Sequence, residues 1–187
     1  MTDKKHVSES CLLKLSAWLI FILFMGMTLI PIPLKLEMAA IEIKMDDPAY
    51  FDNCTINIDG YYHFNILSND RFYGNISVSG YELTSERMDT VYISKDGHSL
   101  YYHRFDEFSH DEYGHPLKLE YSLGRLVSGR FFRDMIIAVY SDNPIDKASG
   151  WKESGTWGTW NIQNGVCIIT NAKTYAEGFQ KVQKRME

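Results

Sequence analysis

The sequence predicts a mainly β protein, with an N-terminal transmembrane helix followed by an antiparallel β-sandwich or open barrel and one C-terminal helix. Three observations lead to this fold class. A charge-free apolar run lies near the N-terminus, short segments of alternating apolar and polar residues follow it, and helical spacing of apolar residues returns only at the end of the chain. Strand and helix patterns do not alternate, which disfavours a parallel, doubly wound sheet.

The apolar run covers residues 15–34 and contains no charged side chain. A helix of about twenty residues, at about 1.5 Å per residue, matches a hydrocarbon layer of about 30 Å. Trp18 suits a membrane interface near its start. The run is longer than the apolar part of a typical signal peptide, and Met38 is too large for the outer position of a cleavage site. We therefore expect a retained anchor, with a cleaved secretory signal as the alternative.

Lysines precede the apolar run, at positions 4, 5 and 14, whereas acidic residues outnumber lysines directly after it. This bias predicts a cytoplasmic N-terminus in a single-pass protein of the cell membrane. The expected organisation is a cytoplasmic tail over residues 1–14, the transmembrane helix over 15–34, a stalk over 35–50, and an extracytoplasmic β-rich domain over 51–187.

The first half of the domain shows five strand patterns. Residues 54–60 alternate up to an Asp-Gly turn signal that leads into a second strand at 61–67, and alternation returns at 71–80. Residues 89–95 and 98–105 flank Asp96-Gly97, a dipeptide that favours two-residue turns, so they predict a hairpin.

The second half continues this pattern. Alternation in residues 117–122 predicts a strand, and the uninterrupted apolar run 135–140 predicts a central one. Residues 156–162 and 166–171 flank Asn164-Gly165 and predict another hairpin. Thr174 and Glu177 have the spacing of a capping box, and four apolar residues then follow at helical spacing (Tyr175, Phe179, Val182 and Met186).

Two cysteines, Cys54 and Cys167, fall in predicted strands of the exported domain. A bridge between them would close a loop of about 113 residues and contribute about 4 to 5 kcal/mol in the chain-entropy model. Two buried thiols that act as small apolar groups are an equal alternative.

Residues 103–115 hold three of the six histidines and four carboxylates. His103, His110 and His115 are seven and five residues apart, which is not the short spacing of a zinc site, so we expect a solvated polar loop. The alternative is a weak divalent-metal site formed by His110, Asp111 and His115, or an acid/base site. No other cofactor is expected.

Three of the four tryptophans, Trp151, Trp157 and Trp160, cluster in residues 150–165. Exposed tryptophans on strands can stack on sugar rings or peptide side chains, so they are candidate ligand-binding residues. Trp157 and Trp160 are three apart and would face opposite sides of a regular strand, so packing of at least one in the core is expected.

The formal net charge of −5 excludes a basic nucleic-acid footprint, and the common catalytic motifs are absent from the sequence. The predicted function is therefore a membrane-anchored, non-catalytic binding or interaction domain at the cell envelope. Its partners would be the lipid bilayer, through residues 15–34, and an envelope protein or glycan. The alternatives are a metal-dependent or acid/base envelope hydrolase that uses His103 to His115, and a structural subunit of a membrane complex.

Overall fold

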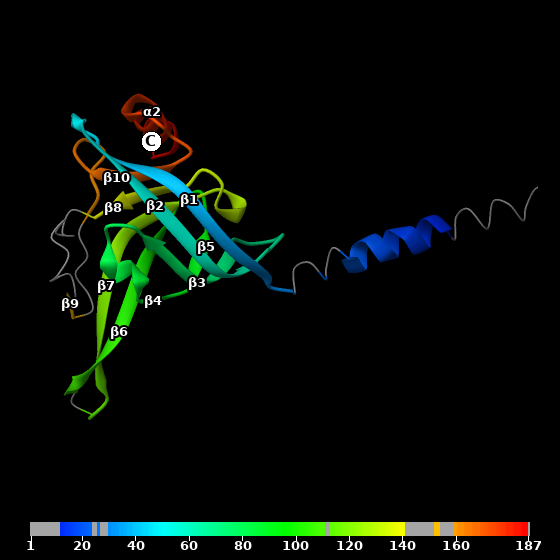
Figure 1. Cartoon of the computed structure of the whole chain (residues 1–187). Helices are drawn as coiled ribbons and strands as arrows, with labels where there is room; N and C mark the ends of the chain where they lie inside the picture. Colours follow the sequence, from blue (N-terminus) through cyan, green and yellow to red (C-terminus); the bar gives the residue numbers. More distant parts are fainter. Residues whose placement is uncertain are drawn as a thin grey trace, which may run out of the picture.

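The computed structural model of the chain describes residues 12–23, 26, 30–110, 113–140, 152–153 and 159–186. Figure 1 shows a curled sheet with one helix packed on it and a second helix at the N-terminal side. The N-terminal helix covers residues 12–23. The other elements are β1 (Ile32–Lys44), β2 (Asp47–His63), β3 (Asp70–Val78), η1 (Glu82–Ser85), β4 (Arg87–Met88), β5 (Val91–Ile93), β6 (His98–His110), β7 (Pro116–Val127), η2 (Arg130–Phe132), β8 (Ile136–Val139), β9 (Lys152–Glu153), β10 (Val166–Thr170) and α2 (Tyr175–Met186).

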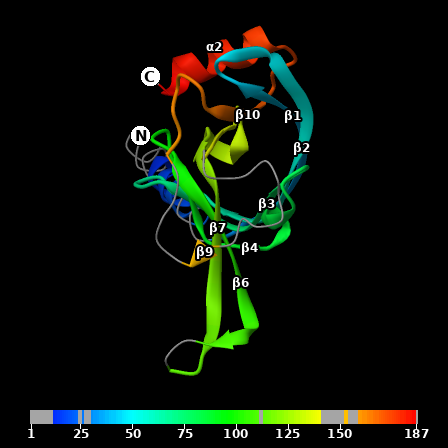
Figure 2. The same ribbon diagram turned by 90° about the vertical axis from the view of Figure 1, so that its left-hand side faces the viewer.

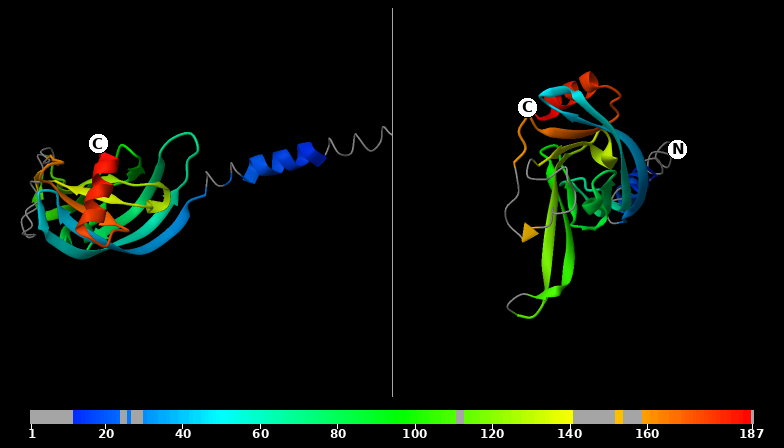
Figure 3. Two further views of the ribbon diagram at one scale, coloured as in Figure 1. Left: turned by 90° about the horizontal axis from the view of Figure 1, so that it is seen from above. Right: turned by 60° about the vertical axis from the view of Figure 1, so that its left-hand side comes forward.

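The described strands form one sheet in the order β4-β6-β7-β8-β10-β1-β2-β3-β5, with β9 paired to β7, and every pairing is antiparallel. The sheet curls until its two edges approach one another, which gives a half-barrel (Figure 3). The prediction of a mainly β, antiparallel fold with one C-terminal helix is confirmed, and the open-barrel form replaces the sandwich.

The inward face of the curled sheet holds the main core. Alternate residues along most strands contribute to this core, because successive side chains of a pleated strand point to opposite faces. Its large, fully buried side chains include Tyr62, Phe72, Tyr102, Leu123 and Ile137. The central-strand prediction for residues 135–140 is confirmed, because β8 lies between β7 and β10 and all four of its residues are buried. An apolar run suits such a strand because both of its faces are covered.

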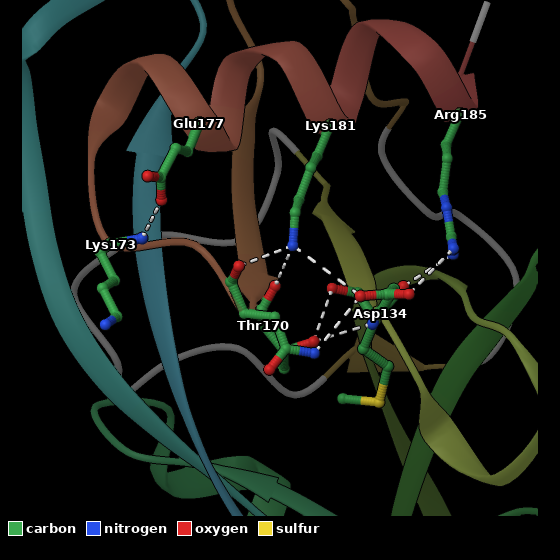
Figure 4. Close-up of polar contacts among 8 residues, drawn as sticks. Asp134, Thr170, Lys173, Glu177, Lys181 and Arg185 are labelled. Carbon is green, nitrogen blue, oxygen red and sulfur yellow. Dashed lines mark hydrogen bonds and ion pairs between the residues drawn. The ribbon is translucent and has the colours of Figure 1, made fainter.

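Helix α2 covers the outer face of β1, β8 and β10 with a second core (Figure 2). Its predicted start is confirmed: the Glu177 amide donates to Thr174 Oγ1 at 3.3 Å, and Glu177 accepts from the Lys173 amide at 2.8 Å. Val182, on the face of α2 that packs on the sheet, is fully buried. Figure 4 shows how Lys181 and Arg185 reach down to the sheet, where both pair with Asp134. The basic side chains of the last turns therefore hold the helix in place.

The N-terminal predictions need two corrections. Residues 32–34, expected at the end of the transmembrane helix, belong to β1, because Ile32 and Leu34 begin an alternation that packs against the core. Residues 35–50, expected as a stalk, form most of β1, a turn and the start of β2. Within the part of the chain that the structure describes, no helix combines the length and apolarity that crossing a membrane requires.

Three turn predictions also need correction. Asp59-Gly60 is not a turn, because β2 continues through it and Gly60 lies opposite Gly74 of β3. Asp96-Gly97 does form a turn, yet β5 pairs with β3 rather than with β6. At Asn164-Gly165, the preceding residues 159–161 are not a strand, and β10 pairs with β8 and β1 instead.

Candidate functional site

The histidine-rich stretch belongs to a protruding hairpin and not to a loop. Strand β6 runs on to His110 and pairs with β7 through His103–Glu120, Phe105–Lys118 and His110–Pro116. The far part of this hairpin, which we call the ribbon (residues 104–119), extends beyond the body of the half-barrel (Figure 2). The expected solvated loop is therefore reduced to the few residues that join the two strands.

His103 lies at the base of the ribbon within a network of charged side chains. Its Nδ1 is 3.1 Å from Asp89 Oδ1, and Lys118 Nζ lies 4.0 Å from Asp89 and 2.9 Å from Glu120. These partners come from β7 and from the segment after β4, so the network joins the ribbon to the barrel. We assign His103 a structural role.

The predicted metal ligands are only partly brought together. His110 and His115 are both exposed at the tip of the ribbon, and Asp111 lies outside the described residues. Among the residues that are described, no three His, Cys, Asp or Glu side chains group closely enough to hold a metal ion. The tip therefore presents His110 at the end of β6 and His115 just before β7, which are fewer than the three protein ligands of a typical metal site.

Of the three candidate tryptophans, Trp151 and Trp157 lie outside the described residues, and Trp160 is half-buried against the core beneath α2. Its indole N–H donates to the Val166 carbonyl at 3.2 Å. Trp160 thus packs as expected for at least one of the two tryptophans, and its indole donor is used inside the protein; a ligand-binding role for it stays a prediction.

The cysteines follow the second of their two alternatives, as buried thiols. Cys54 and Cys167 are free and buried, on the two strands that flank β1. Cys54 lies in the core inside the barrel, whereas Cys167 lies in the core beneath α2, so their side chains are on opposite faces of the sheet. Burial raises the pKa of each thiol to about 12, which makes both thiols unreactive.

A buried ionic network that sequence reasoning missed lies where the chain enters the sheet. Asp70 is 2% exposed and accepts hydrogen bonds from Tyr62 Oη at 2.6 Å and from the Asn65 amide at 2.7 Å. Arg130 Nε is 3.3 Å from the same carboxylate, and its guanidinium stacks on Phe64. The carboxylate is thus fully satisfied by the protein, as a buried charge must be.

The connection from β7 to β8 closes over this network in a strained conformation. Phe131, Phe132 and Asp134 all have φ between 52° and 56°, in the left-handed region that non-glycine residues rarely adopt. The Phe131 amide donates to Tyr62 Oη at 3.1 Å, and the two rings stack at 4.5 Å. Burial, followed by the hydrogen bond to Asp70, raises the pKa of Tyr62 above its ordinary value.

Two neighbouring cavities open at this end of the barrel. One, of about 400 Å³, is lined by Asp70, Lys95 and Arg130 together with residues of the β2–β3 connection. The other, of about 380 Å³, shares Lys95 with it and is lined by Lys184 and Arg185 of α2. The first cavity is also lined by Asp96, so its two cations lie beside two carboxylates, whereas the charged residues that line the second are all basic.

A second buried carboxylate, Glu42, lies at the opposite end of the barrel and is 7% exposed. Tyr50 Oη donates to Glu42 Oε1 at 2.6 Å, and Tyr81 is also hydrogen-bonded to Glu42. No cation pairs with Glu42 within the described ranges. Burial is the largest cause that raises the pKa of Tyr50 and of Tyr81, and proximity to Glu42 adds to it.

Neither buried carboxylate carries a catalytic arrangement. Their oxygens accept structural hydrogen bonds, and within the described segments no histidine, serine or cysteine side chain is hydrogen-bonded to them. The described surface also presents an exposed ribbon at one end of the barrel and a cation-bordered opening at the other. The sequence signal for Asp70 was its place in a turn-like Ser-Asn-Asp stretch, which does not reveal burial.

Comparison with protein families, with characterised proteins and with solved structures finds nothing similar to this chain. The fold and the site therefore define a class only by their geometry: an antiparallel half-barrel that has a protruding ribbon at one end and a cation-bordered opening at the other.

Proposed function

We propose that the protein is a membrane-anchored, non-catalytic binding domain that uses its ribbon to contact another component of the cell envelope. The observation that carries this proposal is the exposure of large aromatic side chains on the ribbon. Phe108 is 95% exposed, and Phe105 and Tyr113 are also exposed. Exposed aromatic groups on a projecting element are typical of protein contacts.

The anchoring part of the proposal is supported by the N-terminal helix. Every described residue from 12 to 23 is exposed, and apolar side chains such as Leu15, Ile20 and Phe21 lie on different sides of the helix. A helix that is apolar all round needs an apolar environment, and no part of the described domain buries it. The bilayer supplies that environment, with the lysine-rich N-terminus on the cytoplasmic side and the half-barrel outside.

The binding part is supported by the shape of the ribbon. A two-stranded hairpin that leaves the body of a sheet lacks core on both faces, and such hairpins are marginally stable alone. The charged network around His103 fixes its base, so its aromatic tip is presented in a defined direction. Contact with a partner would bury the tip and supply the missing packing.

The experiment is a comparison of partners recovered with the full chain after chemical cross-linking in its native membrane and mild detergent extraction. The test variant is Phe108→Ser with Tyr113→Ser. The matched control is Phe51→Ser, which removes an exposed aromatic ring from β2, outside the ribbon. We expect one partner to be recovered with the wild type and the control and reduced at least tenfold with the ribbon variant. Equal recovery with all three proteins would reject the ribbon as the contact.

A further inference from the structure

The connection between β2 and β3 presents apolar side chains to solvent at the end of the barrel where the chain enters. Leu67 is 96% exposed and Ile66 is also exposed. The tip of this β2–β3 connection is held in place, because the amides of Leu67 and Ser68 donate hydrogen bonds to Asn65 Oδ1 at 3.0 and 3.2 Å. Asn65 is in turn tied to Asp70, so the buried network holds this apolar tip outward.

Cations and a third apolar side chain surround the tip. Arg130 and Lys95 border the adjoining cavity, and Arg130 is bonded to the β2–β3 connection through the Asn65 carbonyl. Phe131 and Arg133, in the β7–β8 connection, are exposed at the same end. Apolar groups flanked by basic ones match the two layers of a bilayer surface, its acyl region and its phosphates.

Tyrosines form a strip on the outer face of the sheet close to this end. Tyr61 of β2 lies directly opposite Tyr73 of β3, and Tyr92 of β5 lies beneath the guanidinium of Arg71. All three rings are exposed. Tyrosine is enriched at the level of lipid headgroups because its ring is apolar and its hydroxyl is polar.

The two ends of the barrel differ in charge. One end of the barrel carries Ile66 and Leu67. The connections at this end, residues 64–69, 94–97, 128–135 and 171–174, contain four basic and two acidic residues, which is a net charge of +2. At the other end, residues 45–46 and 79–90 contain one basic and four acidic residues, which is −3. An anionic membrane would therefore attract the first end and repel the second.

The length of the chain brings this end to the membrane. Only Pro31 separates Ile30 of the apolar segment from Ile32, the first residue of β1. Ile32 pairs with Tyr62, three residues before Asn65. Because one residue spans at most about 3.6 Å, a barrel whose preceding segment lies in the bilayer must hold this end at the headgroups.

We propose that this end of the half-barrel rests on the bilayer, with Ile66 and Leu67 inserted among the lipids and Lys95, Arg130 and Arg133 at the lipid phosphates. The inference rests on the proposed membrane anchoring. Contact between this end and the bilayer would fix the barrel relative to the anchor. The ribbon would then point away from the membrane, toward a partner.

The test uses the full chain reconstituted in nanodiscs of phosphatidylcholine, with or without phosphatidylglycerol. Leu67→Cys is labelled with a polarity-sensitive fluorophore in a Cys11→Ser background, since Cys54 and Cys167 are buried. The control carries the same label at Phe108→Cys, which is equally exposed but on the ribbon. We expect the probe at position 67 to shift to the blue, to be quenched by bromolipids and to be several-fold less accessible to aqueous iodide than the control.

Flotation of the same proteins with vesicles separates the two proposals. Protein that floats while its position-67 probe stays as accessible to iodide as the position-108 probe overturns the docking of this end alone. Protein that fails to float overturns the anchoring and the docking together. For the cations, Lys95→Glu with Arg133→Glu should abolish any extra blue shift caused by phosphatidylglycerol. A shift that persists unchanged overturns their contact with phosphates.

Discussion

The two buried carboxylates of the half-barrel are compensated in different ways. Asp70 receives a tyrosine hydroxyl, a backbone amide and an arginine, whereas Glu42 receives tyrosine hydroxyls and has no cation within the described residues. Asp70 therefore ties strand β2 and two connections, β2–β3 and β7–β8, together at the proposed membrane end. Glu42 ties the start of β2 and the segment before η1 to β1, and nothing there neutralises its charge. The first end is built for rigidity, and the second depends on protonated tyrosines.

Alkaline unfolding is the largest effect that this comparison predicts. Burial raises the pKa of Tyr50, Tyr62, Tyr81, Tyr102 and Tyr121 above the ordinary value of 10.0. Below pH about 10 both the folded and the unfolded chain keep these hydroxyls protonated, so their contribution to stability is complete. As the pH rises further, only the unfolded chain ionises, and stability falls by up to about 1.4 kcal/mol per pH unit for each fully buried tyrosine, such as Tyr102, and by less for Tyr50, which is only partly buried. Tyrosinate absorbance should rise together with loss of circular dichroism; ionisation well before unfolding would contradict the prediction.

Substitution of the carboxylates themselves separates the two ends. Asp70→Asn should lower the free energy of unfolding by about 2 to 3 kcal/mol, because it leaves Arg130 unpaired beside a crowded, buried site. The value lies below that of a fully buried pair, since the Arg130 side chain is 56% exposed. Glu42→Gln should cost about 1 kcal/mol, because an amide oxygen still accepts from Tyr50. Urea titration of the full chain in detergent measures both, and equal losses would remove the distinction.

Removal of the tyrosine hydroxyls that bind the carboxylates should have smaller effects than Asp70→Asn. Tyr62→Phe removes the donor to Asp70 and the acceptor of the Phe131 amide, so it should cost about 2 kcal/mol. Tyr50→Phe removes one hydrogen bond from a half-buried side chain and should cost about 1 kcal/mol. Amide hydrogen exchange at Phe131 should accelerate only in the first variant. Unchanged exchange there would mean that Tyr62 does not hold the strained connection.

Local patterns in the sequence predicted the elements whose environment is local. Alternation marked the pleated strands around Ile56 and Ile76, and the spacing of Thr174 and Glu177 marked the start of α2, because capping depends on residues three apart. The same reasoning failed for strand pairing. Asp96-Gly97 does turn the chain, but which strands then pair depends on distant residues. Strand β5 pairs with β3, through Arg71 and Phe72, and not with β6.

The candidate site was less predictable because burial of polar groups is a property of the fold. Asp70 and Glu42 sit in stretches that resembled a turn and a stalk, and only their distant tyrosines and Arg130 make them buried and satisfied. The histidine-rich stretch drew attention by its density, yet the pleat of β6 and β7 spreads its side chains along the ribbon. Alternation of Ile32, Leu34, Leu36 and Met38 was a usable signal for β1 that the apolar run concealed.

Gly60 and Gly74 face one another at positions that point into the barrel, and the ring of Phe72 occupies the room above both. A methyl group on Gly60 would lie 2.3 Å from the Tyr73 carbonyl, and one on Gly74 would lie 2.2 Å from that of Asp59. Strands β2 and β3 thus have no side chains at this paired position, and the ring of Phe72 fills the space that those side chains would occupy. The curvature that shapes the whole interior therefore depends on atoms that are absent, and no conservative replacement exists at either position.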